Sequence, residues 1–108
     1  MICNTYKQFF ATMAEPARLE IVNSLRKRAS SVNGLCQELK MEQSRVSHQL
    51  NKLKKLGFVD NKRDGKEMIY TLRDWLKPLF KIIDGHVDTY YHQHCKCTGQ
   101  AKIDRWKR

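Results

Sequence analysis

The chain lacks any apolar run long enough to cross a membrane, since no stretch approaches the roughly 18 apolar residues that a spanning helix needs. Its first seven residues, MICNTYK, also lack the charged-then-apolar order of a secretory signal. A cytoplasmic protein without a membrane partner is therefore expected. Its four cysteines could form two disulfides, but a cytosolic chain has little need of them, so we interpret them as thiols.

Catalytic motifs are absent as well. The chain has only five glycines and no glycine-rich phosphate loop, and it has neither a nucleophile elbow nor paired catalytic carboxylates. A chain of 108 residues makes one small domain with a thin core, which leaves little room for a substrate cleft. An enzyme is the least expected class, and we assign no catalytic residue.

Acidic residues are scarce relative to basic ones. The chain has 21 lysines and arginines against 11 aspartates and glutamates, which gives a net charge of +10 and an isoelectric point near 9.7. Such an excess is typical of a surface that binds phosphates. Seven of the cations lie within residues 43–66, against two aspartates. Nucleic acid is therefore the expected partner.

Apolar spacing predicts a mainly helical fold. Residues 6–13 and 16–28 read as two helices separated at Pro16, a residue that suits the first turn of a helix. A third helix is expected over residues 32–39, capped by Ser30 or Ser31, with Cys36 buried as a small hydrophobe. A long last helix, capped by Asp74, should run through residues 90–91, and its wide apolar stripe suits self-association.

The most informative stretch, residues 41–72, predicts a DNA-reading helix followed by a hairpin. Val46, Leu50 and Leu53 recur with helical period, and Gly57 should end this helix. Hydroxyl, imidazole, amide and ammonium groups then occupy the opposite side, where they could reach base edges and phosphates. The predicted DNA contacts on this helix are Gln43, Ser44, Arg45, Ser47, His48, Asn51 and Lys52.

After this helix, Phe58-Val59, the turn signal Asp64-Gly65 and residues 68–72 predict a β-hairpin. Residues 61–66 should form its protruding basic loop, from which Arg63 and Lys66 would hold flanking phosphates. A recognition helix followed by a cationic hairpin predicts the winged helix-turn-helix fold.

The same residues carry a family resemblance. Residues 14–21, 32–35, 43–50, 53–59, 62–66 and 69–72 together resemble the ArsR/SmtB family of transcriptional repressors. Lys40 and Glu42 depart from the pattern, which often has glycine and a serine cap there. The resemblance implies a homodimer joined through its first and last helices, with two recognition helices in successive major grooves of palindromic operator DNA. Residues 1–98 would form this domain, and residues 99–108 a basic tail.

Members of the family commonly release DNA when an effector binds, and a zinc-type site in them resembles Asp-x-His followed by two ligands eleven and fourteen residues later. Asp84-Gly85-His86 matches the first half, Cys97 lies eleven residues on, and Gln100 is a poor fourth ligand. His86 and Cys97 would share one helical stripe, whereas Asp84 and His86 are about 200° apart. We assign the candidate metal ligands Asp84, His86, His94, Cys95 and Cys97.

In an antiparallel helix pair these ligands would come from both chains and suit zinc, cobalt, cadmium or nickel. Arsenite remains open, because Cys95 and Cys97 could recruit a third thiolate from the partner chain. The rival hypotheses are a reversible dithiol switch of Cys95 with Cys97 or Cys36, a repressor without an effector, and an architectural protein that coats DNA by charge alone. The leading prediction is a dimeric repressor that leaves its operator when metal binds.

Overall fold

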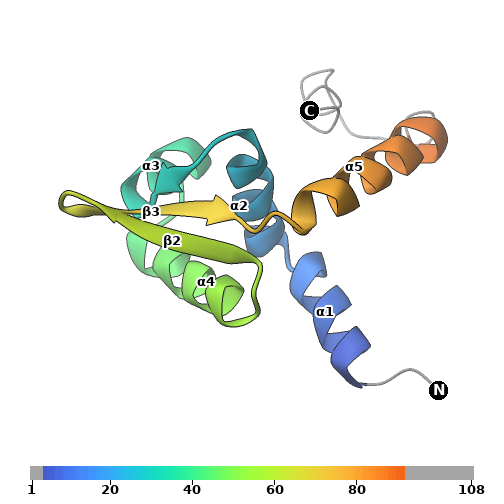
Figure 1. Ribbon diagram of the computed structural model, residues 1–108, viewed down its shortest axis with the longest axis horizontal. Helices are drawn as coiled ribbons and strands as arrows, with labels where there is room; N and C mark the ends of the chain where they lie inside the picture. Colours follow the sequence, from blue (N-terminus) through green and yellow to red (C-terminus); the bar gives the residue numbers. More distant parts are fainter. Residues whose placement is uncertain (1–3, 92–108) are drawn as a thin grey trace. The chain divides into compact units, whose positions relative to one another are not determined.

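A computed structural model describes residues 4–91 (Figure 1). It divides after Arg73 into two compact units, which we describe separately. The elements of the first unit are α1 (Asn4–Ala14), α2 (Pro16–Lys27), β1 (Ser30–Ser31), α3 (Val32–Leu39), α4 (Gln43–Lys55), β2 (Val59–Asp64) and β3 (Glu67–Leu72). The second unit contains α5 (Leu76–His86) and a π-helical turn, η1 (Val87–Tyr91). The predicted fold, mainly helical with a hairpin wing, is confirmed.

The core of the first unit forms where the apolar stripes of α2, α3 and α4 meet one face of the sheet. Burying such stripes is what holds an amphipathic helix in place. Phe9 of α1 packs on Phe58, with ring centroids 5.5 Å apart, and so ties α1 to this core. The buried apolar residues are Ala17, Ile21, Val22, Leu25, Leu35, Val46, Leu50, Leu53, Phe58, Val59, Tyr70 and Leu72. Cys36, predicted to be buried, is only half-buried, because it lies at the edge of the α3 stripe beside fully buried Leu35.

Three predicted helix boundaries are confirmed with their chemistry. Pro16 opens α2, and Ser31 caps α3 by accepting a hydrogen bond of 3.1 Å from the backbone N–H of Gly34. Gly57, at φ +79°, ends α4. The backbone N–H of Phe58 donates to the carbonyl of Leu53, and the backbone N–H of Gly57 donates to the carbonyl of Lys54. This pair of hydrogen bonds is the Schellman motif.

The sheet has one strand more than the sequence predicts. Its order is β1-β3-β2, with Ser30 opposite Tyr70 and Ser31 opposite Ile69. A strand of two serines has no hydrophobic alternation, so period-2 patterning could not reveal it. The pairing joins the start of α3 to the hairpin.

The predicted loop over residues 61–66 is wrong. Residues 61–64 belong to β2 and pair with β3, from Asn61 opposite Tyr70 to Asp64 opposite Glu67, so the loop is only Gly65-Lys66. Gly65 takes a positive φ of 64°, which permits a two-residue turn, and polar side chains are tolerated on a strand that is exposed to solvent. The wing, defined as residues 59–72, is therefore an ordered ribbon almost to its tip.

The turn between α3 and α4 contains the two departures from the family pattern. Lys40 adopts the left-handed conformation with φ 55°, and its backbone N–H bonds the carbonyl of Cys36. Glu42 occupies the cap position of α4 without a side-chain hydrogen bond to the helix. Both residues therefore leave local stabilisation unused.

Replacing Lys40 with glycine should stabilise the fold. The left-handed conformation costs an L-residue about 1–2 kcal/mol, part of which is offset by the greater freedom of glycine in the unfolded chain. We expect a net gain of about 0.5–1 kcal/mol, seen as a rise in Tm of about 2–6 °C by differential scanning calorimetry. Gly57→Ala is the opposite control and should lower Tm. The added Cβ meets no atom within 4 Å, so the cost comes from the positive φ that alanine would have to adopt. A lower Tm for Lys40→Gly would contradict this account of the turn.

In the second unit, the predicted cap at Asp74 is wrong, because Trp75 occupies the cap position without a side-chain bond. Trp75 already has helical angles, φ −67° and ψ −23°, whereas a side-chain cap requires an extended backbone. Asp74 instead lies 3.7 Å from the Lys77 ammonium. The helical path continues to Tyr91 as predicted, with a change to π geometry at Val87. Among residues 4–91 no helix has both the length and the apolar character that crossing a bilayer would require.

Candidate nucleic-acid interface

The helix α4 separates its residues cleanly into a buried and an exposed side. Val46, Leu50 and Leu53 have no exposed surface. Of the predicted contact residues on this helix, only Ser47 is half-buried. The exposed ones, which we call the polar face of α4, are Gln43, Ser44, Arg45, His48, Asn51 and Lys52. The helix thus presents hydrogen-bond donors, acceptors and cations along one side.

The wing extends beyond the helices, with its tip at the left of Figure 1. Arg63 and Lys66, the two cations predicted to hold phosphates, are both exposed on it. Its base is joined to α4 by a hydrogen bond of 2.7 Å from the Lys54 ammonium to the Asn61 side chain. The guanidinium of Arg73, the residue after β3, lies 3.0 Å from the carboxylate of Asp60 in β2. The Lys54 contact therefore ties the wing to α4, and the Arg73 contact joins the two strands at the base of the wing.

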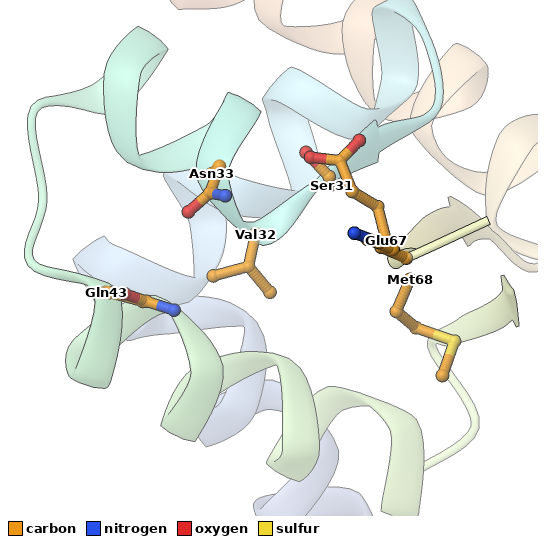
Figure 2. A pocket seen from close by; sticks show the side chains of 7 residues that line it. Ser31, Val32, Asn33, Gln43, Glu67 and Met68 are labelled. Atoms are coloured by element: carbon orange, nitrogen blue, oxygen red, sulfur yellow. The ribbon is translucent and has the colours of Figure 1, made fainter. Parts of the chain in front are cut away.

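A shallow depression links the start of α4 to the wing tip (Figure 2). Its volume of 160 Å³ is below the roughly 300–1,000 Å³ of ordinary small-molecule sites. The depression brings Gln43 and Lys66, two predicted DNA contacts, onto one surface. Asn33 and Glu67, which the sequence analysis did not single out, belong to the same surface. Its lining residues are Ser31, Val32, Asn33, Gln43, Lys66, Glu67 and Met68.

Behind the polar face, Glu15 and Arg18 connect α2 to α4. The Glu15 carboxylate accepts a 2.9 Å hydrogen bond from the backbone N–H of Arg18 and thereby caps α2. The Arg18 Nε donates a 2.8 Å hydrogen bond to the side-chain oxygen of Gln49. Sequence reasoning missed this link, because nothing in the local pattern pairs residues 31 positions apart.

The Glu15 carboxyl is stabilised in its ionised form. The hydrogen bond from the Arg18 backbone N–H is the main reason that the pKa of Glu15 is lowered. Partial burial opposes the shift, while the Ala17 N–H and the positive charges of Arg18 and Arg45 add to it. Arg45 belongs to the polar face of α4, so the charge of Glu15 interacts with that helix.

The lowered pKa predicts a pH-dependent contribution to stability. Because the folded pKa lies below the ordinary value of 4.5, the ionised carboxylate stabilises the fold above that pH. This contribution is lost as the pH falls through the folded pKa. Glu15→Gln should therefore reduce the free energy of unfolding at pH 7 by about 1 kcal/mol at most, the contribution of a cap, and lower Tm accordingly. The difference from wild type should disappear in acid. Thermal melts from pH 7 to pH 2 test this. Glu20→Gln, at an exposed site on α2, should change Tm little at any pH, and a Glu15 effect that persists in acid would contradict the electrostatic cause.

The candidate metal ligands are only partly within the described residues. Asp84 is buried, whereas His86 is exposed and stacks on Tyr90 with ring centroids 4.6 Å apart. The two side chains thus lie in different surroundings, as their expected angular separation implies. Within residues 4–91 no three histidine, cysteine or acidic side chains gather as a metal site. His94, Cys95 and Cys97 lie outside the described residues.

Comparison with known proteins identifies the family. Residues 15–61 match the model of the bacterial regulatory proteins of the ArsR family. The chain is 44% identical over 62 residues to the HTH-type transcriptional regulator NmtR of Mycobacterium tuberculosis, a match covering 57% of this chain and 52% of NmtR. It is 34% identical over 79 residues to the HTH-type transcriptional regulator MJ1325 of Methanocaldococcus jannaschii, covering 71% of this chain and 89% of that one.

Solved structures agree. The crystal structure of Rv0081 of M. tuberculosis superposes with a TM-score of 0.77 at 30% identity, covering 84% of this chain and 93% of Rv0081. The solution structure of apo-NmtR gives a TM-score of 0.69 at 31% identity, covering 90% and 80%. By sequence, the chain spans little more than half the length of the first curated relatives, 52% of NmtR and 58% of Rv0081. The winged helix-turn-helix, the family model and the relatives agree that the chain belongs to the ArsR/SmtB family, whose members are transcriptional regulators and not enzymes.

Proposed function

We propose that the chain acts as a cytoplasmic, homodimeric repressor that binds operator DNA and is released by a metal ion. The observation that carries this proposal is the exposed polar face of α4 beside an exposed, cationic wing in a chain of this family. Base edges in the major groove are read by hydroxyl, amide, imidazole and guanidinium groups, and phosphates by cations. Ser44, Arg45 and His48 would read bases, while Lys52, Arg63 and Lys66 would hold phosphates.

Exposed apolar side chains support the dimer. In α1, Tyr6 and Phe10 are 64% and 65% exposed, and they line a groove with no polar surface together with Thr5 and Phe9. Ile82 of α5 is 72% exposed and Tyr90 of η1 is 60% exposed. Large apolar side chains gathered on a small protein commonly mark an interface. A symmetric dimer would bury these side chains and present α4 twice to a palindrome.

The metal part of the proposal rests on the residue types near and beyond the end of α5. Asp84 and His86 are joined by no third candidate ligand in the described unit, so a site needs His94, Cys95 or Cys97, or ligands from a partner chain. Exposed His86 is the better placed of the two, since a buried carboxylate such as Asp84 can help to fix a ligand rather than bind directly. Imidazole and thiolate donors suit zinc, cobalt, nickel or cadmium. When bound, the metal would favour one relative orientation of the two protomers and so change DNA affinity.

A gel shift on the upstream DNA of the gene tests binding and release together. Purified protein should retard this fragment in the presence of excess competitor DNA, and one of zinc, cobalt, nickel, cadmium or arsenite should release it. The coupling expected of such systems, about 1–3 kcal/mol, corresponds to a loss of affinity of roughly 5–150-fold. Cobalt also gives a thiolate absorption band when cysteine binds it, which reports metal binding without DNA.

Changing Cys95 and Cys97 to serine should abolish the metal response and the cobalt–thiolate band, while leaving metal-free DNA binding intact. Release by oxidant and not by metal would favour the dithiol switch instead. Release by neither would identify a repressor without these effectors. Equal binding to operator and competitor, with a steep salt dependence, would contradict a sequence-specific repressor and indicate an architectural protein.

A further inference from the structure

The Arg18 guanidinium makes a directional contact between α2 and α4, the proposed recognition helix. Its Nε lies 2.8 Å from the side-chain oxygen of Gln49, and the Arg18 side chain is only 16% exposed. Gln49 follows His48 on α4 but is half-buried, whereas His48 is exposed. The bond therefore fixes the inner side of α4, while the residues predicted to read DNA lie on its outer side.

Apolar packing holds the inner side of α4 against the core. Val46, Leu50 and Leu53 are completely buried, but hydrophobic contact is not directional, so small rotations of a helix about its axis change little of the buried area. A charge-assisted hydrogen bond has a preferred length and angle. The contact from Arg18 to Gln49 thus adds an angular restraint to this packing on the side of α4 that faces α2.

Glu15 holds Arg18 from the other side. Its carboxylate lies 4.0 Å from the Arg18 Nε and also accepts the bond from the Arg18 backbone N–H. Glu15 is the single residue between α1, which ends at Ala14, and α2, which begins at Pro16. The chain of contacts runs from this joint through Arg18 to Gln49 on the recognition helix.

We infer that Arg18 is a positioning residue for DNA recognition, which fixes the rotation of α4 through Gln49 without touching DNA itself. The inference rests on the proposed function, because rotation matters only if the polar face of α4 reads bases. A misrotated helix would still lie beside DNA, and its lysines would still meet phosphates. Loss of Arg18 should therefore weaken binding to operator far more than binding to unrelated DNA.

The experiment measures affinity of the full chain for its upstream DNA and for an unrelated duplex of equal length, over a series of salt concentrations. Arg18→Gln should lower the ratio of the two affinities about tenfold, the effect of losing one hydrogen bond to a charged group. The salt dependence should stay unchanged, since no phosphate contact is lost. Arg26→Gln is the matched control, because Arg26 lies on the same helix and its guanidinium bonds Asn23 within α2. It should leave the ratio within about twofold.

Two substitutions of Gln49 complete the test. Gln49→Leu should reproduce the Arg18→Gln defect. The double variant Arg18→Gln with Gln49→Leu should lower the affinity ratio about tenfold and not a hundredfold, because both substitutions remove the same hydrogen bond. Gln49→Glu keeps an acceptor for Arg18 and should retain the operator preference. Circular dichroism checks the folding of each variant, and if Arg18→Gln does not fold, the pair Gln49→Leu and Gln49→Glu decides the question alone.

The outcomes separate this inference from the proposed function. An unchanged affinity ratio in both Arg18→Gln and Gln49→Leu would overturn the positioning role while the wild type still prefers its operator. Equal weakening on both DNAs, with a salt slope reduced by about one for each arginine removed, would show that Arg18 is itself a phosphate contact. A wild type that does not prefer operator would overturn the proposed function, and the positioning role with it.

Discussion

Phe10→Asp in α1 and Ile82→Asp in α5 are each expected to convert the proposed dimer into a monomer of 12.8 kDa. Both side chains are largely exposed in the single chain, so the substitutions should leave its fold intact while placing a charge in the proposed interface. Because burying an unpaired carboxylate in the interface is strongly unfavourable, the two protomers should no longer associate. Analytical ultracentrifugation gives the oligomeric state directly.

The same variants should lose operator affinity by about 10²–10⁴-fold, since each protomer would bind its half-site alone. Leu56→Asp is a matched control: Leu56 is also an exposed apolar residue, 48% exposed at the end of α4, but lies outside the proposed interface. This variant should remain dimeric. Dimeric Phe10→Asp and Ile82→Asp proteins would show that the exposed residues of α1 and α5 have another role.

Combined replacement of His48 and Lys52 by alanine should strongly reduce the affinity for operator DNA. One base contact contributes about 1–3 kcal/mol of discrimination, and one phosphate contact adds to affinity on any sequence. Because each protomer loses both, we expect operator affinity to fall at least about 100-fold, with a salt slope reduced by about one for each lysine removed. Fluorescence anisotropy at several salt concentrations measures both quantities.

Lys27→Ala, which removes one exposed cation from the end of α2, provides the comparison for charge alone. It should reduce affinity modestly and equally on operator and unrelated DNA. If the His48 and Lys52 variant binds operator as wild type does at fixed salt, α4 is not the recognition helix.

The elements that the sequence predicts correctly are those whose signals are local. In α4, three apolar residues at helical spacing and a glycine after the last turn define the helix, and the polar face follows from its geometry. Pro16 and Ser31 likewise indicate the starts of α2 and α3. Proline suits the first turn of a helix, and the serine side chain caps the helix that follows it.

Some features that escaped prediction depend on partners distant in sequence, and others depend on local backbone geometry. Ser30 and Ser31 become a strand only because β3 lies beside them, and residues 61–64 pair because Gly65 allows a tight turn. The bond from Arg18 to Gln49 spans 31 positions and requires the packed helices to exist first. Asp74 was predicted to cap α5, but Trp75 occupies the cap position and already has helical backbone angles.

The place of β2 in the sheet has a consequence for experiments on the wing. In the described sheet β2 is an outer strand, so one row of its backbone groups has no neighbouring strand to bond. Charged side chains such as Lys62 and Arg63 discourage another molecule from adding itself there and starting aggregation. Neutralising them would impair colloidal behaviour as well as phosphate contact, so light scattering has to accompany any affinity measured on such variants.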